Sequence, residues 1–297
     1  MIKEEPITAL SEAAKLEAEA DVPVVVIAPS RGWGALQLRA LWEYRELLYF
    51  LVWRDLKVRY RQTALGALWI VIQPLVSMVV FSFLFGTLLR VPSGEVPYPI
   101  FVYAALLPWN YFASSLTRSS TSIVGSAHLI TKVYFPRLII PIAGVLSGLV
   151  DFGIAFLVLV SMMAYYGVIP TPATLLLPVF LLLAMLTALG FSLWLSALNV
   201  RFRDVNYLIP FLIQVWMYVT PVIYGTTLIP ERFRFLLGLN PMTGVVEGFR
   251  WALLGARLAD AQAPGPLFAA SVLISLAVLV SGVIFFRTTE RTFADIV

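Results

Sequence analysis

Two rows of aromatic and polar side chains are the residues in this sequence best suited to binding a ligand. Within each row the members are three or four residues apart, and this spacing places them along one side of a helix. Rings mixed with amide and hydroxyl groups suit sugars, because the C–H faces of a sugar stack on rings while polar groups form hydrogen bonds. The rows consist of Trp69, Gln73, Ser77, Phe81 and Phe85, and of Tyr207, Phe211, Gln214 and Tyr218. Ordinary packing within a helical bundle, with an aromatic belt at the membrane interface, is the alternative interpretation.

Residues for covalent or metal-assisted catalysis are scarce. The sequence has one histidine, His128, and no cysteine, which argues against a catalytic zinc site and excludes disulfides. No Gly-x-x-x-x-Gly-Lys-Ser/Thr loop occurs, so we expect no ATP bound in that way and no cofactor in this chain. We find no nucleophile accompanied by a base and an acid, which disfavours a membrane glycosyl- or acyltransferase.

The composition indicates that long helices in lipid position these rows. The chain has 297 residues, of which 60% are apolar and 13% charged, and its mean hydropathy is +0.88. Globular domains have roughly 45–50% apolar and about 25% charged residues. The apolar excess must face lipid, which excludes a soluble enzyme, a disordered chain and a disulfide-stapled secreted module. In a membrane protein, Lys and Arg residues mark which loops are cytoplasmic. The net charge of +4 therefore does not indicate nucleic-acid binding, and we expect no nucleic-acid partner.

The sequence predicts an all-α integral membrane protein with six transmembrane helices. A hydrocarbon core of about 30 Å needs roughly 20 apolar residues per helix. Six stretches meet this requirement, namely 66–89, 96–117, 138–169, 171–200, 205–230 and 261–286. With the N-terminus inside, sixteen of the 21 Lys and Arg residues fall on the inner side and five on the outer side. This asymmetry predicts that both termini are cytoplasmic.

The residues before the first span divide into two parts. Residues 1–34 are predicted to form a cytoplasmic tail, with one short strand at 22–28, because the segment is acidic and its apolar stretch is too short for a signal peptide. Residues 35–62 place apolar and cationic side chains on opposite sides of a helix, which predicts an amphipathic interface helix. A cytosolic helix packed on a partner is the alternative. Residues 63–297 form the predicted six-span transmembrane domain.

Two connecting segments differ from plain loops. Residues 125–137, on the cytoplasmic side, have an apolar face that needs a partner, which is either another protein or this chain's own bundle. Residues 228–264, on the outer side, read as two half-length helices broken at Asn240 and Pro241. They are too charged for a span and too apolar for a solvated loop, which predicts a re-entrant pair of half-helices. A helical hairpin lying on the outer surface is the alternative.

Asp151 is the only charged residue inside a predicted span. Ionisable groups at this depth are costly and often functional. Gly144 and Gly148 lie nearby with small-xxx-small spacing, which predicts close helix packing and favours a paired or protonated packing role for Asp151. No second titratable group falls inside another predicted span, because Arg118 is assigned to the cytoplasmic loop. This absence disfavours an ion-coupled carrier.

Four motifs in order give the sequence a resemblance to a known family. They are WRDLKVRYRQTALGALWIVIQPL at 53–75, TKVYFPRLIIPIAG at 131–144, NVRFRDV at 199–205 and LNPMTGVVEGFRWALLG at 239–255. The chain resembles the transmembrane permease subunit of ATP-binding-cassette exporters for O-antigen, capsule and teichoic acid. The resemblance covers roughly residues 39–291 and leaves out the tail. Export of a small drug or lipid by the same class is the alternative.

The resemblance implies a set of partners and roles. It implies a homodimer docked on two ATPase subunits that bind ATP and magnesium, in a bacterial cytoplasmic (inner) membrane, and a polysaccharide carried on undecaprenyl diphosphate. The first and fifth spans would line the channel, and Arg54, Arg59 and Arg61 would attract the lipid diphosphate. Residues 125–137 would be the coupling helix, with His128, Lys132, Tyr134, Phe135 and Arg137. Residues 228–264 would be the periplasmic gate, with Asn240, Pro241, Glu247 and Arg250.

Overall fold

A computed structural model describes residues 38–61, 66, 68–258, 265–290 and 293 of the chain. The chain divides into two compact units, residues 1–40 and 41–297. The predicted tail at 1–34, with its short strand, lies outside the described residues. The second unit contains the elements that position the site.

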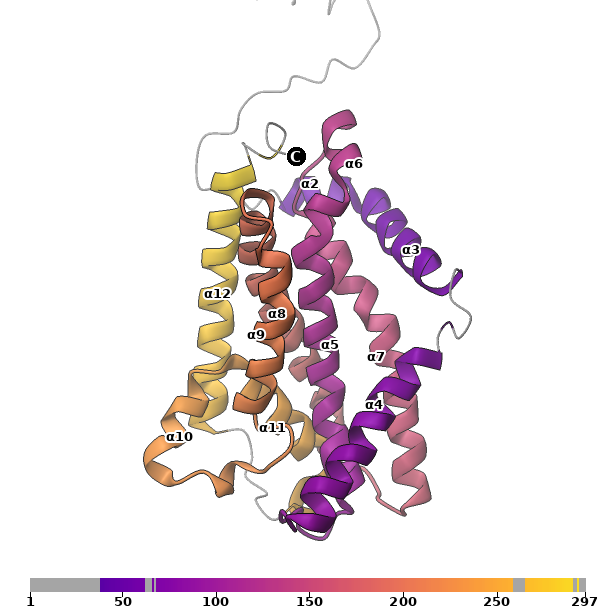
Figure 1. Cartoon of the computed structure of the whole chain (residues 1–297), viewed down its shortest axis with the longest axis vertical. Coiled ribbons are helices and arrows are strands. Elements are labelled where there is room, and N and C mark those ends of the chain that lie inside the picture. The colour runs from indigo at the N-terminus through magenta and orange to yellow at the C-terminus, as the bar shows by residue number, and fades with distance from the viewer. Residues whose placement is uncertain (1–37, 62–65, 67, 259–264, 291–292, 294–297) are drawn as a thin grey trace, which may run out of the picture. The chain divides into compact units, whose positions relative to one another are not determined.

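Within the described residues every regular element is a helix (Figure 1). The α-helices are α2 (Leu38–Glu43), α3 (Arg45–Arg61), α4 (Leu68–Phe81), α5 (Tyr98–Gly125), α6 (Ala127–Lys132), α7 (Ile139–Tyr165), α8 (Leu177–Arg201), α9 (Val205–Val219), α10 (Glu231–Gly238), α11 (Pro241–Leu254) and α12 (Pro266–Glu290). A π-helical segment, η2 (Ser82–Leu88), continues α4, and short 3₁₀ turns are η3 (Pro172–Leu176), η4 (Thr226–Leu228) and η5 (Gly255–Arg257).

The chain is a multi-pass membrane protein. Among the described residues, four helical stretches are long and apolar enough to cross a membrane, namely Leu68–Leu88, Ile139–Tyr165, Pro172–Arg201 and Pro266–Glu290. They coincide with the first, third, fourth and sixth predicted spans. The helices that correspond to the other two predicted spans end at different residues from those predicted.

The second and fifth predicted spans correspond to α5 and α9. Helix α5 continues past the expected end at 117 to Gly125, so the assignment of Arg118 to a loop is wrong. Helix α9 ends at Val219, short of the expected end at 230. Pro221 is the physical reason, because the residue before a proline disfavours helical angles, and Thr220 is accordingly extended at ψ 138°.

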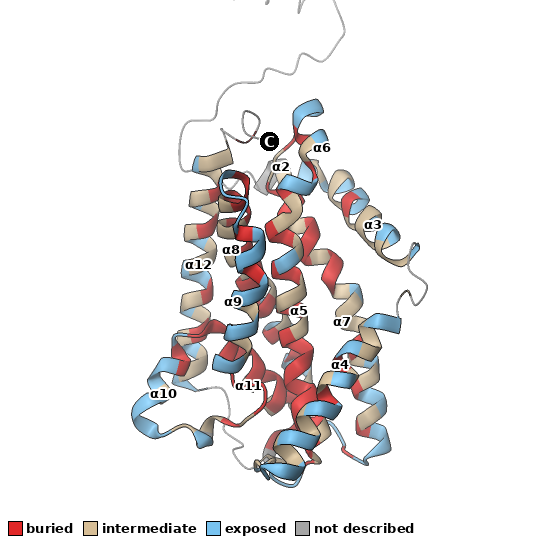
Figure 2. Cartoon of the chain, in the orientation of Figure 1, coloured by how far each residue is buried: buried red, intermediate tan, exposed pale blue. Residues whose placement is uncertain are grey.

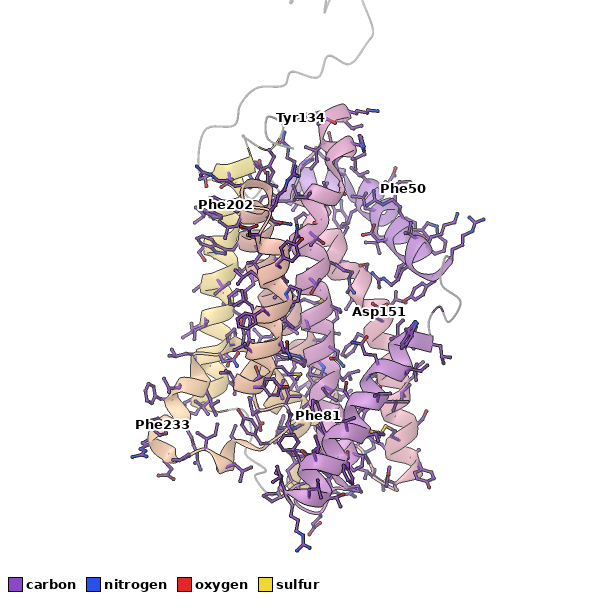
Figure 3. All side chains as sticks on the ribbon, viewed as in Figure 1. Phe50, Phe81, Tyr134, Asp151, Phe202 and Phe233 are labelled. Carbon is purple, nitrogen blue, oxygen red and sulfur yellow. The ribbon has the colours of Figure 1, made fainter. Side chains whose placement is uncertain are left out.

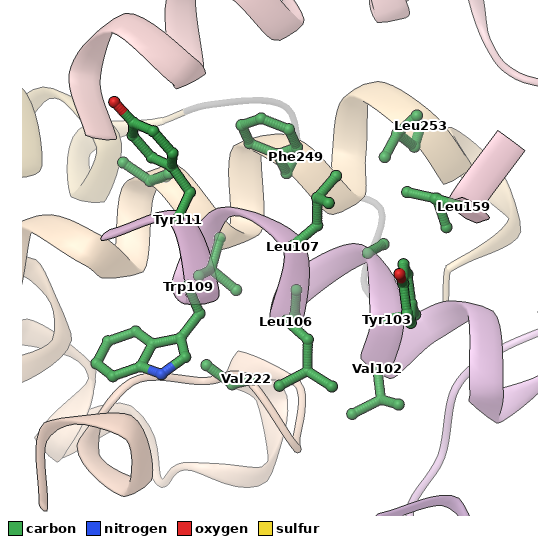
Figure 4. Close-up of a cluster of buried hydrophobic side chains, with 14 of the residues drawn as sticks. Val102, Tyr103, Leu106, Leu107, Trp109, Tyr111, Leu159, Val222, Phe249 and Leu253 are labelled. Carbon is green, nitrogen blue, oxygen red and sulfur yellow. The ribbon is translucent and has the colours of Figure 1, made fainter. Parts of the chain in front are cut away.

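Helix α5 is the central element of the bundle. It packs against α4, α7, α8, α9 and α11, and its N-terminal half is coloured almost entirely as buried in Figure 2. Figure 4 shows Leu106, Leu107 and Trp109 of α5 among Val222 and Phe249. Because apolar side chains cover nearly every side of this half, α5 is held by packing on its neighbours rather than by contact with lipid.

A second core cluster joins α3 to α5, α7, α8 and α12. Leu51 of α3 is 1% exposed and belongs to this cluster with Ile139 of α7, Leu193 of α8 and Phe286 of α12. Leu51 therefore fixes α3 to the side of the bundle. The other α3 residues are exposed or half-buried, including Trp53, and Trp42 of the preceding helix α2 is exposed as well.

Helices α8 and α12 approach closely at two glycines. A Cβ atom at Gly190 would lie 2.8 Å from the backbone nitrogen of Leu279, and a Cβ atom at Gly282 would lie 2.5 Å from the carbonyl oxygen of Gly190. Backbone atoms cannot turn aside as a flexible side chain can. Small residues at such positions let transmembrane helices pack at short distance.

We expect Gly190→Ala to destabilise the protein, because α8 and α12 must move apart by the added methyl group at a cost of about 1–3 kcal/mol. The measurement is the thermal unfolding midpoint of the purified chain in detergent. Gly153→Ala is the matched control, since a Cβ atom at Gly153 meets nothing within 4 Å. Equal midpoints for the two variants would contradict the close approach.

Candidate functional site

Helices α4, α5 and α7 surround a cavity of about 380 Å³. One part of its lining is aromatic and another part is polar. The aromatic residues are Trp69, Tyr103, Tyr111 and Phe152, and the polar ones are Gln73, Asn110, Ser114, Thr117, Arg118 and Asp151. The first row of the sequence prediction thus contributes Trp69 and Gln73, and the charged residues come from two other helices.

A charged cluster forms one wall of the cavity around Asp151, which Figure 3 labels on α7. Arg59 Nη1 donates to Asp151 Oδ2 at 2.5 Å, and Arg118 Nη1 donates to the same oxygen at 3.3 Å. The Tyr60 hydroxyl donates to Asp151 Oδ1. Burial and the hydrogen bond to Asp151 raise the pKa of Tyr60 to about 12, so the phenol keeps its proton. The cluster joins α3, α5 and α7.

The cluster confirms a paired role for Asp151 and corrects one premise. The sequence reasoning found no second titratable group in another predicted span, but Arg118 lies within α5 and forms an ion pair with Asp151. The prediction ends the second span before Arg118 because this residue is charged, whereas the helix continues through it. Helical spacing within α5 does not reveal that Asp151, which lies 33 positions after Arg118, pairs with the Arg118 guanidinium.

Two glycines of α7 make room for the cluster, as the small-xxx-small spacing predicts. A Cβ atom at Gly144 would lie 2.6 Å from Ser119 Oγ, and one at Gly148 would overlap the Arg118 guanidinium. Arg118 Nε also donates to the Gly144 carbonyl oxygen at 3.4 Å. The absence of side chains here lets α5 approach α7 and lets Arg118 reach Asp151.

A polar side of α5 extends from the cavity toward the C-terminal end of the helix. Asn110, Ser114, Thr117 and Thr121 are partly or fully exposed and are three or four residues apart. Thr117 Oγ1 donates to the Ala113 carbonyl at 2.9 Å, which satisfies the donor and leaves acceptor capacity on the hydroxyl oxygen. Sequence reasoning missed this side because the residues lie in a charge-free run. Their helical spacing was the signal that could have found it.

The remaining members of the first row leave the cavity. Ser77 is half-buried, and Phe81 and Phe85 pack edge to face with ring centroids 6.1 Å apart. Both rings also pack against the main core cluster. The π-helical segment that begins at Ser82 changes the angular register, so the row does not continue as one side of a helix.

The second row occupies one side of α9, as its spacing predicts. Tyr207 is 84% exposed, Phe211 62% and Tyr218 54%, and Gln214 is also exposed. Trp216 on the inner side of α9 packs edge to face on Phe112 and Phe191. The exposed aromatic side is therefore separate from the aromatic residues that hold α9 in the bundle.

The three predicted phosphate-binding arginines of α3 do not converge. Arg54 forms an ion pair with the neighbouring Asp55 at 3.0 Å, and Arg59 points to Asp151. Arg61 is exposed at the last residue of α3. The structure therefore brings together Arg59 and Arg118, a pair that the sequence analysis did not consider.

The predicted coupling segment contains α6 and an extended exit. His128, Lys132 and Tyr134 are exposed, with Tyr134 at 73%. Phe135 is buried in the second core cluster. Arg137 donates to the Glu290 carbonyl oxygen at the end of α12, and its guanidinium lies 6.0 Å from the Phe293 ring. Phe135 and Arg137 thus hold this segment on the bundle, while the other three residues form its free surface.

Two polar side chains hold the turn after α9. Arg250 is 1% exposed, and it donates to the carbonyl oxygens of Pro221 at 2.7 Å and Tyr224 at 3.0 Å. It also forms an ion pair with Glu247 at 3.1 Å. Asn240 caps α11 by accepting from the Met242 nitrogen, with Pro241 as the first helical residue.

The same asparagine connects α11 to the end of α9. Asn240 Oδ1 accepts from Trp216 Nε1 at 2.9 Å, and its Nδ2 donates to Thr220 Oγ1 at 2.9 Å. Asn240 and Arg250 therefore hold α11 and the turn at 220–224 together, while Pro241 begins α11 and Glu247 pairs with Arg250.

Comparison with known proteins identifies the class of the chain. It belongs to the ABC-2 type transporter family, whose sequence profile matches residues 46–254. The matched region begins in α3 and ends at the last residue of α11, so it contains the charged cluster and both aromatic rows. The chain is accordingly a membrane permease subunit, a transport component without a catalytic domain.

Three relatives of this chain have names that describe them as transport or export proteins. The chain is 32% identical over 261 residues to an O-antigen export system permease protein of Myxococcus xanthus, covering 87% of this chain and 98% of the relative. It is 22% identical over 245 residues to a polysialic acid transport protein of Escherichia coli, covering 80% and 91%. It is 27% identical over 198 residues to an inner membrane transport permease of Escherichia coli strain K12, covering 62% and 75%.

We expect Asp151→Asn to lower the stability of the protein by about 3 kcal/mol, because two partly buried guanidinium groups then lie together without their carboxylate. The measurement is the thermal unfolding midpoint in detergent. Asp55→Asn is the matched control, since the Arg54–Asp55 pair is more exposed and such pairs contribute about 0–1 kcal/mol. A midpoint for Asp151→Asn no lower than that of the control would contradict this account of the cluster.

Proposed function

We propose that this chain is the permease subunit of an ATP-driven exporter that moves lipid-linked polysaccharide, of the O-antigen or capsule type, across the bacterial cytoplasmic membrane. The observation that carries the proposal is the O-antigen export permease relative, which aligns with this chain over 98% of its own length. The polysialic acid transport relative supports the same substrate class. ATP is bound by a separate ATPase subunit, as in other members of the family.

The proposed topology has six spans, formed by α4 with η2, α5, α7, α8, α9 and α12. Helix α5 has 28 residues, and its length of about 42 Å at 1.5 Å per residue is ample for a membrane. Helix α9 has only 15 residues, and α10 and α11 complete the outer part of this path as re-entrant half-helices. The excess of Lys and Arg on one side favours cytoplasmic termini. The inner membrane relative supports the location.

The polysaccharide path is proposed to run along the exposed side of α9 and the polar side of α5, with a second copy of the chain enclosing it. Three exposed rings on α9 present stacking surfaces, and the hydroxyl and amide groups of α5 present hydrogen-bonding partners. Stacking on single rings is weak, of the order of 1 kcal/mol. Weak and repeated contacts suit a sliding polymer, because one tight site would stop it.

The ATPase subunit is proposed to drive transport by acting on the exposed surface of the segment at 125–137. His128, Lys132 and Tyr134 are exposed there, while Phe135 is anchored in the second core cluster. A push by the ATPase on this surface would be transmitted to α5 and α7, the helices that the segment connects. Arg54 and Arg61 on α3 are proposed to attract anionic lipid at the membrane surface.

We expect the combined substitution of Tyr207, Phe211 and Tyr218 by Ala to lower export by about tenfold, because three stacking surfaces are removed from the path. The measurement is polymer at the cell surface at matched protein levels. The control substitutes Leu273, Leu276 and Val280, three exposed residues of α12, by Ala. Undiminished export in the α9 variant, or an equal loss in the α12 control, would contradict the proposed path.

We expect Tyr134→Asp to weaken association with the ATPase subunit by about tenfold or more, because a charge replaces an exposed aromatic anchor. The measurement is recovery of the ATPase on the tagged permease. Tyr165→Asp is the control, since Tyr165 is 84% exposed at the other end of α7. Normal recovery and normal stimulation of the ATPase with Tyr134→Asp would disprove the coupling assignment.

A further inference from the structure

The cavity between α4, α5 and α7 differs in kind from the exposed side of α9. It belongs to one subunit, and its volume of about 380 Å³ lies near the lower end of the roughly 300–1,000 Å³ found for small-ligand pockets. A space of this size suits one headgroup rather than a passing polymer. Trp69 at 54% exposure leaves one wall accessible.

Arg118 and Asp151 are the charged residues of the cavity lining, and Arg59 reaches the same carboxylate without lining the cavity. Arg59 and Arg118 both donate to the single carboxylate of Asp151, so two guanidinium groups share one negative charge. The Tyr60 hydroxyl is a further donor to the same carboxylate. A planar guanidinium can bind two oxygen atoms of an anion in parallel, and phosphate has the matching geometry.

The other lining groups have the chemistry of a sugar site. The Trp69 ring offers a stacking surface, and Gln73 and Asn110 offer amides that both donate and accept. The hydroxyl groups of Ser114 and Thr117 lie on the same lining. One cavity therefore combines an anion-binding cation, a stacking ring and hydrogen-bonding groups.

We propose that this cavity binds an anionic saccharide headgroup, a sugar joined to phosphate or diphosphate, with Arg118 as its principal anion ligand. The inference deepens the proposed function and rests on it for the substrate class. The anion takes the place of the Asp151 carboxylate on Arg118, and Asp151 keeps Arg59 and Tyr60 as partners. The sugar stacks on Trp69 and bonds to Gln73. The headgroup is thus held inside one subunit, apart from the α9 path.

The test measures binding by the permease–ATPase complex in nanodiscs without ATP. The probes are farnesyl diphosphate carrying N-acetylglucosamine, farnesyl diphosphate without the sugar, and the uncharged farnesyl glycoside of N-acetylglucosamine. N-acetylglucosamine 1-phosphate is added as a competitor. The variants are Arg118→Gln and, as a matched control for charge, Arg203→Gln, because Arg203 is exposed between α8 and α9 and does not line the cavity.

We expect Arg118→Gln to weaken binding of the sugar-bearing diphosphate by about tenfold, through loss of a charge-assisted bidentate contact, and Arg203→Gln to leave it unchanged. Trp69→Ala should weaken the sugar-bearing diphosphate and not the diphosphate without sugar, and this variant keeps the test decisive if Arg118→Gln does not fold. Competition by the sugar phosphate would show that the headgroup alone suffices, and its failure would show that the lipid is also required.

Wild-type affinity in Arg118→Gln, or equal affinity of the wild type for the uncharged glycoside, would overturn the inference. If only Trp69→Ala can be purified, an equal effect of that variant on both diphosphates would overturn it. The assay needs neither export nor ATP hydrolysis, so a negative result leaves the proposed export function untouched. Failure of the proposed function would instead appear as normal surface polymer in cells that lack this permease.

Discussion

The pairing of the Asp151 carboxylate is the constraint on which the arrangement of α3, α5 and α7 depends. A carboxylate within an apolar span is costly unless it is paired, and Asp151 is paired by groups from two other helices. The last turn of α3 must therefore lie against α7, and α5 must approach closely enough for Arg118 to reach it. Gly148 is required by the same contact. The Arg118–Asp151 part of the cavity lining and the position of α3 thus have one common cause.

The sequence predicts the long helices well because exposure to lipid selects apolar residues locally. The apolar helical stretches of α4 with η2, α7, η3 with α8, and α12 coincide with predicted spans. The predicted ends of the second and fifth spans are wrong for two different reasons. The end of α9 was signalled by Pro221, a local cue that was overlooked. The continuation of α5 past Arg118 depends on a tertiary ion pair, which a single helix does not disclose.

The candidate site was predictable only in part. Helical spacing correctly placed the second aromatic row on one exposed side of α9, because α9 is regular throughout. The first row leaves the cavity after Gln73 because residues at every fourth position turn by about 40° around a helix at each step, and η2 changes the register again after Phe81. The gate role of Asn240, Pro241, Glu247 and Arg250 stays a prediction, and the buried contacts of Arg250 with backbone carbonyls are ones that the sequence does not disclose. The partners of Asp151 lie on helices far apart in sequence, where no spacing rule applies.

The central claim is that this chain provides a saccharide path and draws its energy from a separate ATPase subunit. The most direct measurement follows a labelled lipid-linked oligosaccharide across proteoliposomes that contain this chain with the ATPase subunit, or this chain alone. The account predicts transfer only with both subunits and ATP. Transfer by this chain alone, or ATP hydrolysis by the purified chain, would contradict it.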